Sequence, residues 1–212
     1  MIILLISVFP KTLKKRIGNS NHHYMIPLQQ IDKSWTVFLD RDGVINEEKR
    51  DNYIHKWEEF RFNEGVLEAI AVFSKIFHRI VVVTNQRGVG KGTTQLKDLD
   101  IIHQNMIKAI EDAGGRIDAV YFCPDLNDDS PNRKPNPGMG LQAISRFPEI
   151  DPAKSIMIGN TLSDMGFGRN LGAYTVYLTT THPDIDLSDN RIDMICSSLH
   201  SFASALHTST NS

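Results

Sequence analysis

Two carboxylates stand one residue apart directly after a short apolar run. Thr36–Leu39 is the run, and Asp40 and Asp42 follow it before Gly43. An apolar run of this length predicts a buried strand, and in extended backbone the two aspartates would point to the same side. Like charges this close repel each other unless a cation or a shared proton lies between them. The spacing indicates the start of a site, although a plain polar turn with a glycine would leave the same pattern.

Three further apolar runs also lead into polar residues. Ile80–Val83 ends in Thr84 and Asn85, Ile117–Cys123 precedes the loop that holds Arg133 and Lys134, and Ser155–Ile158 runs into Asn160 and Asp164. In an open α/β sheet, ligands bind at the carboxyl ends of the strands. We therefore expect these side chains to meet Asp40 and Asp42 in one site.

These residue types are the ones that phosphoryl transfer to a carboxylate needs. Asp40 could attack phosphorus as an anion at neutral pH without an activating base. Asp42 could protonate the leaving oxygen and later take a proton from water. Thr84 and Lys134 could hold the phosphoryl oxygens as charge shifts onto them.

A hard cation must separate the nucleophile from a dianionic phosphate. Asp40, Asp42, Asn160 and Asp164 are the oxygen-bearing residues of the pattern that could hold it. The chemistry therefore predicts a hard cation as the cofactor.

Helical patterns alternate with the strands. Apolar residues recur at helical spacing over Asn63–Arg79 and from about Thr94 to Ala113, and a helix is expected over Gly138–Phe147. Further strands are expected at Ala173–Leu178 and Met194–Ser197. Such alternation predicts an α/β fold: a three-layer, doubly wound, mostly parallel sheet with right-handed crossovers.

The length of 212 residues fits one domain with two flanking segments. We assign residues 34–199 to the domain, expect residues 1–33 to be a loosely ordered N-terminal extension, and expect residues 200–212 to be a frayed, Ser/Thr-rich tail. Met1–Phe9 is apolar, but its basic residues follow it and it is too short to span a bilayer. We expect no membrane partner, with a weak peripheral anchor as the alternative.

The overall composition restricts the partners. The formal net charge is −2 and no basic stripe is present, so we expect no nucleic acid to bind. Two cysteines, Cys123 and Cys196, make no disulfide framework. We expect a cytoplasmic monomer that acts on a small phosphorylated substrate.

Four short motifs in this order resemble the haloacid dehalogenase superfamily of phosphatases. They are DRDGV at 40–44, TNQ at 84–86, RKP at 133–135 and GNxxxD at 159–164. The resemblance covers about Thr36–Leu178. It implies an aspartyl-phosphate on Asp40, and it makes Asp42 the general acid/base and the donor of a backbone carbonyl to Mg²⁺. It also implies that Thr84 binds the phosphoryl group, that Lys134 neutralises phosphate and nucleophile, and that Asp164 holds Mg²⁺.

The motif spacing resembles the branch of the superfamily without a large cap domain. Within that branch, DRDGVIN, YIH at 53–55, TNQRGVGKG, YFCP at 121–124 and RKPNPGM are similar to D-glycero-D-manno-heptose 1,7-bisphosphate phosphatases and to histidinol-phosphate phosphatases. This resemblance implies that Arg133 holds a phosphate or sugar of the substrate. Asn85 and His55 are further candidates for the substrate site.

The sequence departs from these relatives in two places. Their zinc loop carries Cys-Pro-His and a later Cys-x-Cys, whereas this chain has Asp125, Ser130 and Asn132 at three of those positions. One remaining thiolate, Cys123, cannot make a structural zinc site, so we expect no zinc and a half-buried Cys123. Asn160 stands where the family usually has Asp, which predicts weaker Mg²⁺ binding because a neutral oxygen replaces an anionic one.

Three functions remain in view. The first is a phosphatase of carbohydrate metabolism acting on a sugar bisphosphate, and the second is a phosphatase acting on histidinol phosphate or on the 3′ end of a nucleic acid. The third is a binding protein that has lost catalysis, with Asn160 as its first sign. GVGKG at 88–92 does not fit a nucleotide P-loop, because Asn85 and Gly92 stand where that motif needs Gly and Ser or Thr; it is either a flexible turn or a loop at the substrate entrance.

Overall fold

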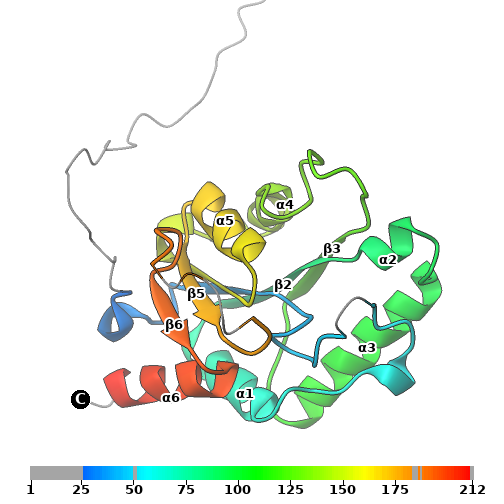
Figure 1. Cartoon of the computed structure of the whole chain (residues 1–212). Helices are drawn as coiled ribbons and strands as arrows, with labels where there is room; N and C mark the ends of the chain where they lie inside the picture. The colour runs from blue at the N-terminus through cyan, green and yellow to red at the C-terminus, as the bar shows by residue number, and fades with distance from the viewer. Residues whose placement is uncertain (1–25, 50–51, 183–185, 187, 211–212) are drawn as a thin grey trace, which may run out of the picture.

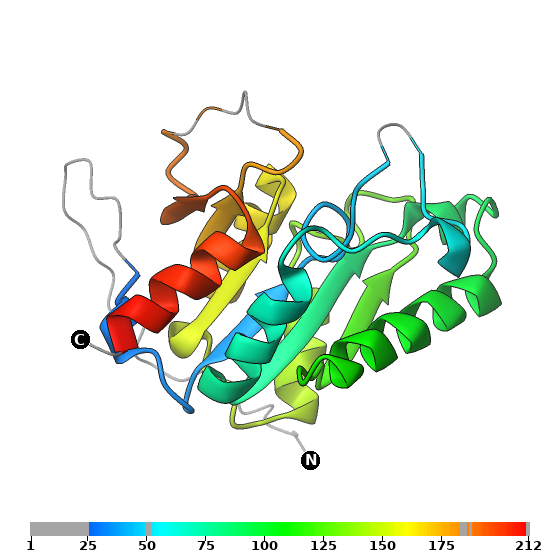
Figure 2. The ribbon, with the colours of Figure 1, turned by 90° about the horizontal axis from the view of Figure 1, so that it is seen from below.

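A six-stranded parallel sheet forms the middle layer of the protein (Figures 1 and 2). The computed structural model describes residues 26–49, 52–182, 186 and 188–210. The sheet has the order β3-β2-β1-β4-β5-β6, and all neighbouring strands are parallel. The strands are β1 (Thr36–Leu39), β2 (Arg79–Asn85), β3 (Ala119–Cys123), β4 (Ser155–Gly159), β5 (Tyr174–Leu178) and β6 (Met194–Cys196).

Helices cover both faces of this sheet (Figure 1). One face carries α1 (Val66–Ile76), α3 (Leu96–Asp112) and α6 (Leu199–Thr210), and the other carries α4 (Gly138–Arg146) and α5 (Leu162–Leu171). The short helix α2 (Arg87–Gly90) follows β2, and the 3₁₀ turns are η1 (Leu28–Gln30), η2 (Trp57–Glu59) and η3 (Pro152–Lys154). The expected three-layer α/β fold is confirmed.

The central strands are apolar because they are covered on both faces. Every residue of β1 is buried, as is every residue of β4. Aromatic rings seal the face under α1 and α6, where Phe73 packs edge-to-face on Phe77 at 5.5 Å and meets Phe202 at 5.9 Å between ring centroids. This rigid centre fixes where the strand ends lie.

No large cap interrupts the described part of the chain. Between Asp42 and Thr84 lie η2, α1 and most of β2, and between Thr84 and Lys134 lie α2, α3 and β3.

The glycines at 88–92 were expected to form a turn or an entrance loop. Gly92 does lie in an exposed turn, at a φ of 71°. Gly88 instead is buried in α2, where a Cβ would come within 2.7 Å of the Thr94 hydroxyl, so close packing favours glycine there.

The described parts of the two flanking segments, residues 26–33 and 200–210, differ from the expectation. The segment predicted as a frayed tail from residue 200 is helix α6, whose Phe202 and Leu206 are fully buried. Within the expected loose extension, Ile26 and Ile31 are buried against the core, and η1 contacts α6. Met1–Phe9 lies outside the described residues. No helix in the described part of the chain has the length and apolarity needed to cross a membrane.

Candidate active site

Polar residues from the neighbouring strands β2, β1 and β4 meet at the carboxyl ends of these strands. Asp40 directly follows β1, its N–H donates to Ile158 O of β4 at 3.0 Å, and Thr84 and Asn85 end β2. A cavity of about 200 Å³ opens at these ends. Its walls include Asp40, Asp42, Thr84, Asn85, Lys134 and Asp164, together with residues of the loop that follows β1.

Lys134 lies at the centre of this group and is 3% exposed. Its Nζ is 2.8 Å from Asp40 Oδ1 and 2.6 Å from Asp164 Oδ1. It also donates to Val83 O at 2.9 Å. Burial would lower the pKa of Lys134, but the two carboxylates outweigh burial and raise it, so the amine is a fixed positive charge beside Asp40.

Helix α5 positions Asp164. The other carboxylate oxygen, Oδ2, accepts from the Thr161 N–H at 3.0 Å and from the Thr161 hydroxyl at 2.7 Å, which is a helix-capping arrangement. A Cβ on Gly159 would lie 2.1 Å from the Asp164 Cβ. Glycine at the end of β4 is therefore required for Asp164 to reach the site.

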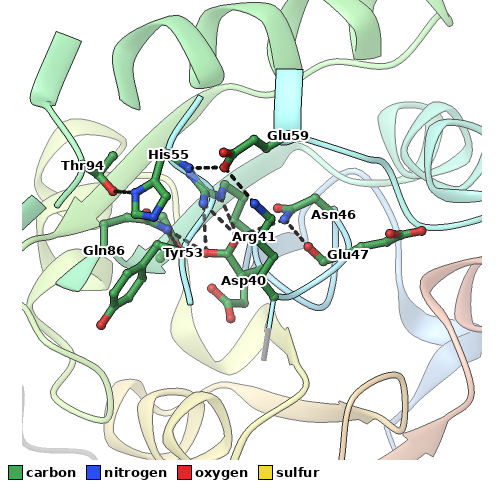
Figure 3. A network of polar contacts seen from close by, with 12 residues as sticks. Asp40, Arg41, Asn46, Glu47, Tyr53, His55, Glu59, Gln86 and Thr94 are labelled. Carbon is green, nitrogen blue, oxygen red and sulfur yellow. Dashed lines mark hydrogen bonds and ion pairs between the residues drawn. The ribbon is translucent and has the colours of Figure 1, made fainter. Parts of the chain in front are cut away.

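Asp42 is held from three directions, by three donors that are labelled in Figure 3. Arg41 Nη2 donates to both of its oxygens, at 2.8 and 3.0 Å, Asn46 Nδ2 donates at 2.9 Å, and Gln86 Nε2 donates at 2.8 Å. Burial would raise the pKa of Asp42, but the Arg41 charge and these hydrogen bonds outweigh burial and lower it. Gln86 also donates to Thr84 Oγ1 at 2.9 Å, so it links the acid/base candidate to the phosphate-binding candidate.

Asp40 has the opposite electrostatic balance. Burial raises its pKa, Lys134 lowers it in part, and the charges of Asp164 and Asp42 raise it further. The net shift is upward. A cation bound beside Asp40 would favour its ionised form, which is the form a nucleophile needs.

Three candidate substrate residues take positioning roles in this structure. The side chain of Asn85 clamps the backbone of Lys134, accepting from its N–H at 3.0 Å and donating to its C=O at 3.2 Å. The ring nitrogens of His55 face Thr94 Oγ1 at 2.8 Å and Asn52 Oδ1 at 3.1 Å, so the ring ties the loop down rather than lining the cavity (Figure 3). Arg133 donates to Asp128 Oδ1 at 2.8 Å and does not line the cavity either.

Asn160 is fully buried and lies behind the cavity wall. Its Nδ2 donates to Glu48 Oε2 at 3.0 Å and to Thr181 Oγ1 at 2.9 Å. Its Oδ1 is buried and has no hydrogen-bond partner among the described residues. An unpaired buried oxygen is costly unless something else binds it.

The oxygen donors fit a magnesium ion. Mg²⁺ takes one or two carboxylates and keeps several waters; here Asp40 lines the open cavity and Asn160 Oδ1 is unpaired. The described residues contain no group of three or more Asp, Glu, His or Cys side chains set for a metal. A Mg²⁺ site here would therefore rest on few side chains, a backbone carbonyl and water.

Sequence reasoning missed the residues that orient Asp42. Arg41, Asn46 and Gln86 all lie within the recognised motifs, but their partners depend on tertiary structure. His103 of α3 is 7% exposed, and its Nε2 lies 3.3 Å from Arg41 Nη1.

Hydrogen bonds hold the loop that carries the positions of the relatives' zinc ligands. Ser130 Oγ donates to Asp125 Oδ2, and Asn136 Nδ2 donates to Ser130 O at 2.9 Å. Cys123 was expected to be half-buried, but it is fully buried in the core under α4 and α5. Burial raises the pKa of the Cys123 thiol, so it stays protonated.

A doubly wound parallel sheet with a carboxylate pair and a buried lysine at the carboxyl ends of its strands defines a class of phosphate-ester hydrolases. The HAD-hydrolase-like family matches residues 131–202. A D-glycero-alpha-D-manno-heptose-1,7-bisphosphate 7-phosphatase of Mycobacterium tuberculosis is 36% identical over 140 residues, which cover 66% of this chain and 74% of the relative. A D-glycero-beta-D-manno-heptose-1,7-bisphosphate 7-phosphatase of Vibrio cholerae is 37% identical over 153 residues, covering 68% and 81%.

A solved structure agrees with these relatives. The D,D-heptose 1,7-bisphosphate phosphatase of B. bronchiseptica, complexed with magnesium and phosphate, superimposes with a TM-score of 0.73 at 29% identity, covering 82% of this chain and 98% of that one. The chain belongs to the HAD superfamily of phosphatases and, within it, to the heptose-bisphosphate phosphatase family.

Proposed function

We propose that the protein is a Mg²⁺-dependent phosphatase that removes the 7-phosphate of D-glycero-D-manno-heptose 1,7-bisphosphate through an aspartyl-phosphate on Asp40. The observation that carries the proposal is the buried Lys134, which bridges Asp40 and Asp164 at 2.8 and 2.6 Å at the carboxyl edge of the sheet. The similarity to the heptose-1,7-bisphosphate 7-phosphatases of Mycobacterium tuberculosis and Vibrio cholerae supports the substrate.

The first half of the reaction uses Asp40 and Asp42. The Asp40 carboxylate attacks phosphorus while Lys134 and the Thr84 hydroxyl bind the phosphoryl oxygens, whose charge grows in the transition state. Asp42 gives its proton to the leaving sugar oxygen. A dianionic phosphate entering the cavity raises the pKa of Asp42, because a like charge disfavours the ionised form.

The second half reverses the role of Asp42. The carboxylate left after proton donation takes a proton from water, and that water attacks the phosphorus of the aspartyl-phosphate. Arg41, Asn46 and Gln86 keep the carboxylate in one orientation through both steps. One residue can therefore act as acid and then as base without moving.

Asp40, the backbone carbonyl of Asp42, Asn160 and Asp164 would hold Mg²⁺. When bound, the ion offsets the repulsion between the nucleophile and the phosphate and stabilises charge on the phosphoryl oxygens. The solved relative with magnesium and phosphate supports this assignment.

The loop after β1 contributes polar side chains that suit a sugar. Lys49, Asn52 and Tyr53 of this loop line the cavity, and such side chains can form hydrogen bonds with hydroxyl groups. We also propose that the protein is cytoplasmic, which is supported by Cys123 and Cys196, because both thiols are buried and free.

Phosphate release from a substrate panel tests the proposed function. The panel holds the heptose 1,7-bisphosphate, histidinol phosphate and a 3′-phosphorylated oligonucleotide, each assayed with Mg²⁺. We expect the heptose bisphosphate to have the highest kcat/KM and to lose its 7-phosphate. A higher kcat/KM for either other substrate would overturn the substrate assignment, and no release from any would mean a binding protein.

A further inference from the structure

The carboxylate of Glu48 contacts Asn160, the residue that stands where the family usually has Asp. It belongs to the loop after β1, yet its Oε2 accepts a hydrogen bond from Nδ2 of Asn160, 112 residues further along the chain, at 3.0 Å. Glu48 also lines the cavity that Asp40 and Asp164 line. The contact therefore joins a residue that lines the cavity to the fully buried Asn160 behind the cavity wall.

The hydrogen bonds of Asn160 fix the direction of its amide. The two N–H groups of Nδ2 are used by Glu48 and Thr181, and Oδ1 is left without a hydrogen-bond partner among the described residues. Asn160 follows Gly159 at the end of β4, the strand that pairs with β1. Because Ile158 pairs with Leu39, the end of β4 that leads into Asn160 lies beside the end of β1, where Asp40 begins the site.

The charge balance of the site calls for one more anion. Arg41 neutralises Asp42, and Lys134 offsets one of the two charges of Asp40 and Asp164. These five groups leave a single negative charge for a divalent cation. Glu48 makes two, whereas Lys49, the nearby cation, is paired with Glu59 at 2.9 Å.

We propose that Glu48 is a cation-binding residue of this site, which supplies the negative charge that Asn160 lacks and holds the Asn160 amide with its oxygen free for the ion. The inference rests on the Mg²⁺ site of the proposed function. The negative charges of Asp164 and Glu48 also act on Tyr177. Burial raises the pKa of the Tyr177 hydroxyl, and these two charges raise it further.

The pairing also changes what an aspartate at position 160 would do. Asn160→Asp replaces a hydrogen-bond donor with a carboxylate that faces Glu48 at hydrogen-bond distance. Repulsion between the two carboxylates would cancel much of the gain in affinity for the ion. We therefore expect Asn160→Asp to raise the affinity for the ion clearly only when the Glu48 charge is also removed.

Titration calorimetry with Mg²⁺ alone tests the inference without any turnover. Glu48→Gln keeps the shape and removes the charge, and Glu47→Gln is the matched control because Glu47 is exposed and directs its carboxylate away from the network (Figure 3). We expect Glu48→Gln to weaken Mg²⁺ binding by about tenfold, as expected for one charge near the ion at an intermediate dielectric. Glu47→Gln should change binding less than about twofold.

The second arm combines both positions. We expect Asn160→Asp alone to change the affinity by less than about threefold, and Asn160→Asp in the Glu48→Gln background to restore wild-type affinity or better. That rescue also shows that the protein folds without the Glu48 carboxylate. Equal affinities of Glu48→Gln and Glu47→Gln would overturn the inference while leaving the proposed function intact, whereas a wild type that binds no Mg²⁺ would overturn both.

Discussion

The guanidinium of Arg41 lies against the carboxylate of its own chain neighbour, Asp42, with Nη2 at 2.8 and 3.0 Å from the two oxygens. Arg41 is fully buried, and its Nη1 meets His103 of α3. A buried arginine fork gives both charge and direction to the carboxylate that it binds. The buried Arg41 side chain therefore orients the acid/base residue Asp42 from the interior of the protein.

Arg41→Lys should impair proton donation more than binding. Lysine keeps the charge but loses the planar fork, so we expect kcat on the heptose bisphosphate to fall by about tenfold to a hundredfold with little change in KM. The loss on p-nitrophenyl phosphate should be smaller, because a good leaving group needs little protonation. Steady-state kinetics on both substrates measure the difference.

The exposed substitution Arg146→Lys on α4 is the control for that comparison. It should leave both substrates unaffected. An equal loss of kcat on both substrates in Arg41→Lys would mean that Arg41 supports the fold or phosphate binding rather than the orientation of Asp42.

His103 should make the folded state sensitive to mild acid. Burial, and secondarily the charge of Arg41, lowers its pKa to about 3. Between that value and the ordinary pKa of about 6.5, the unfolded chain binds a proton that the folded chain does not. The free energy of unfolding contributed by His103 is therefore fully present above pH ~6.5 and is lost as the pH falls.

Denaturant unfolding at pH 7.5 and 5.5 checks this sign. Between these values the wild type should lose about 1.4 kcal/mol more than His103→Gln, which cannot titrate but can still accept from Arg41. The exposed His78→Gln variant serves as the control and should follow the wild type. A wild-type loss no larger than that of His103→Gln would contradict the buried, neutral histidine.

The protein should contain no stoichiometric zinc. Asp125, Ser130 and Asn132 stand at three expected zinc positions, and the Ser130 hydroxyl already bonds to Asp125. Elemental analysis of the purified protein checks the prediction, and a content near one zinc per chain would contradict it. A chelator should still remove the phosphatase activity, and added Mg²⁺ should restore it.

The sequence was enough to predict the sheet and the residues at its carboxyl edge. Apolar runs of strand length marked β1, β2 and β4, and the carboxyl ends of adjacent parallel strands lie side by side. Asp40, Asp42, Thr84, Lys134 and Asp164 therefore line one cavity, as expected. Their chemical roles remain predictions.

Contacts between distant segments could not be read in the same way. Composition suggested a frayed tail after residue 200, but Phe202 and Leu206, four residues apart, fall on one face of α6 and are fully buried. The bond from Asn160 to Glu48 depends on how one loop folds back over the sheet edge. A short motif carries no information about such a partner.

Trapping of the covalent intermediate tests the central claim most directly. Asp42→Asn should still accept phosphate from p-nitrophenyl phosphate but should hydrolyse the phosphoenzyme slowly, because the base for water is gone. Peptide mass spectrometry after rapid quenching should then find phosphate on Asp40, and a variant that also carries Asp40→Asn should show none. Phosphate on another residue, or undiminished turnover by Asp40→Asn, would contradict the proposed mechanism.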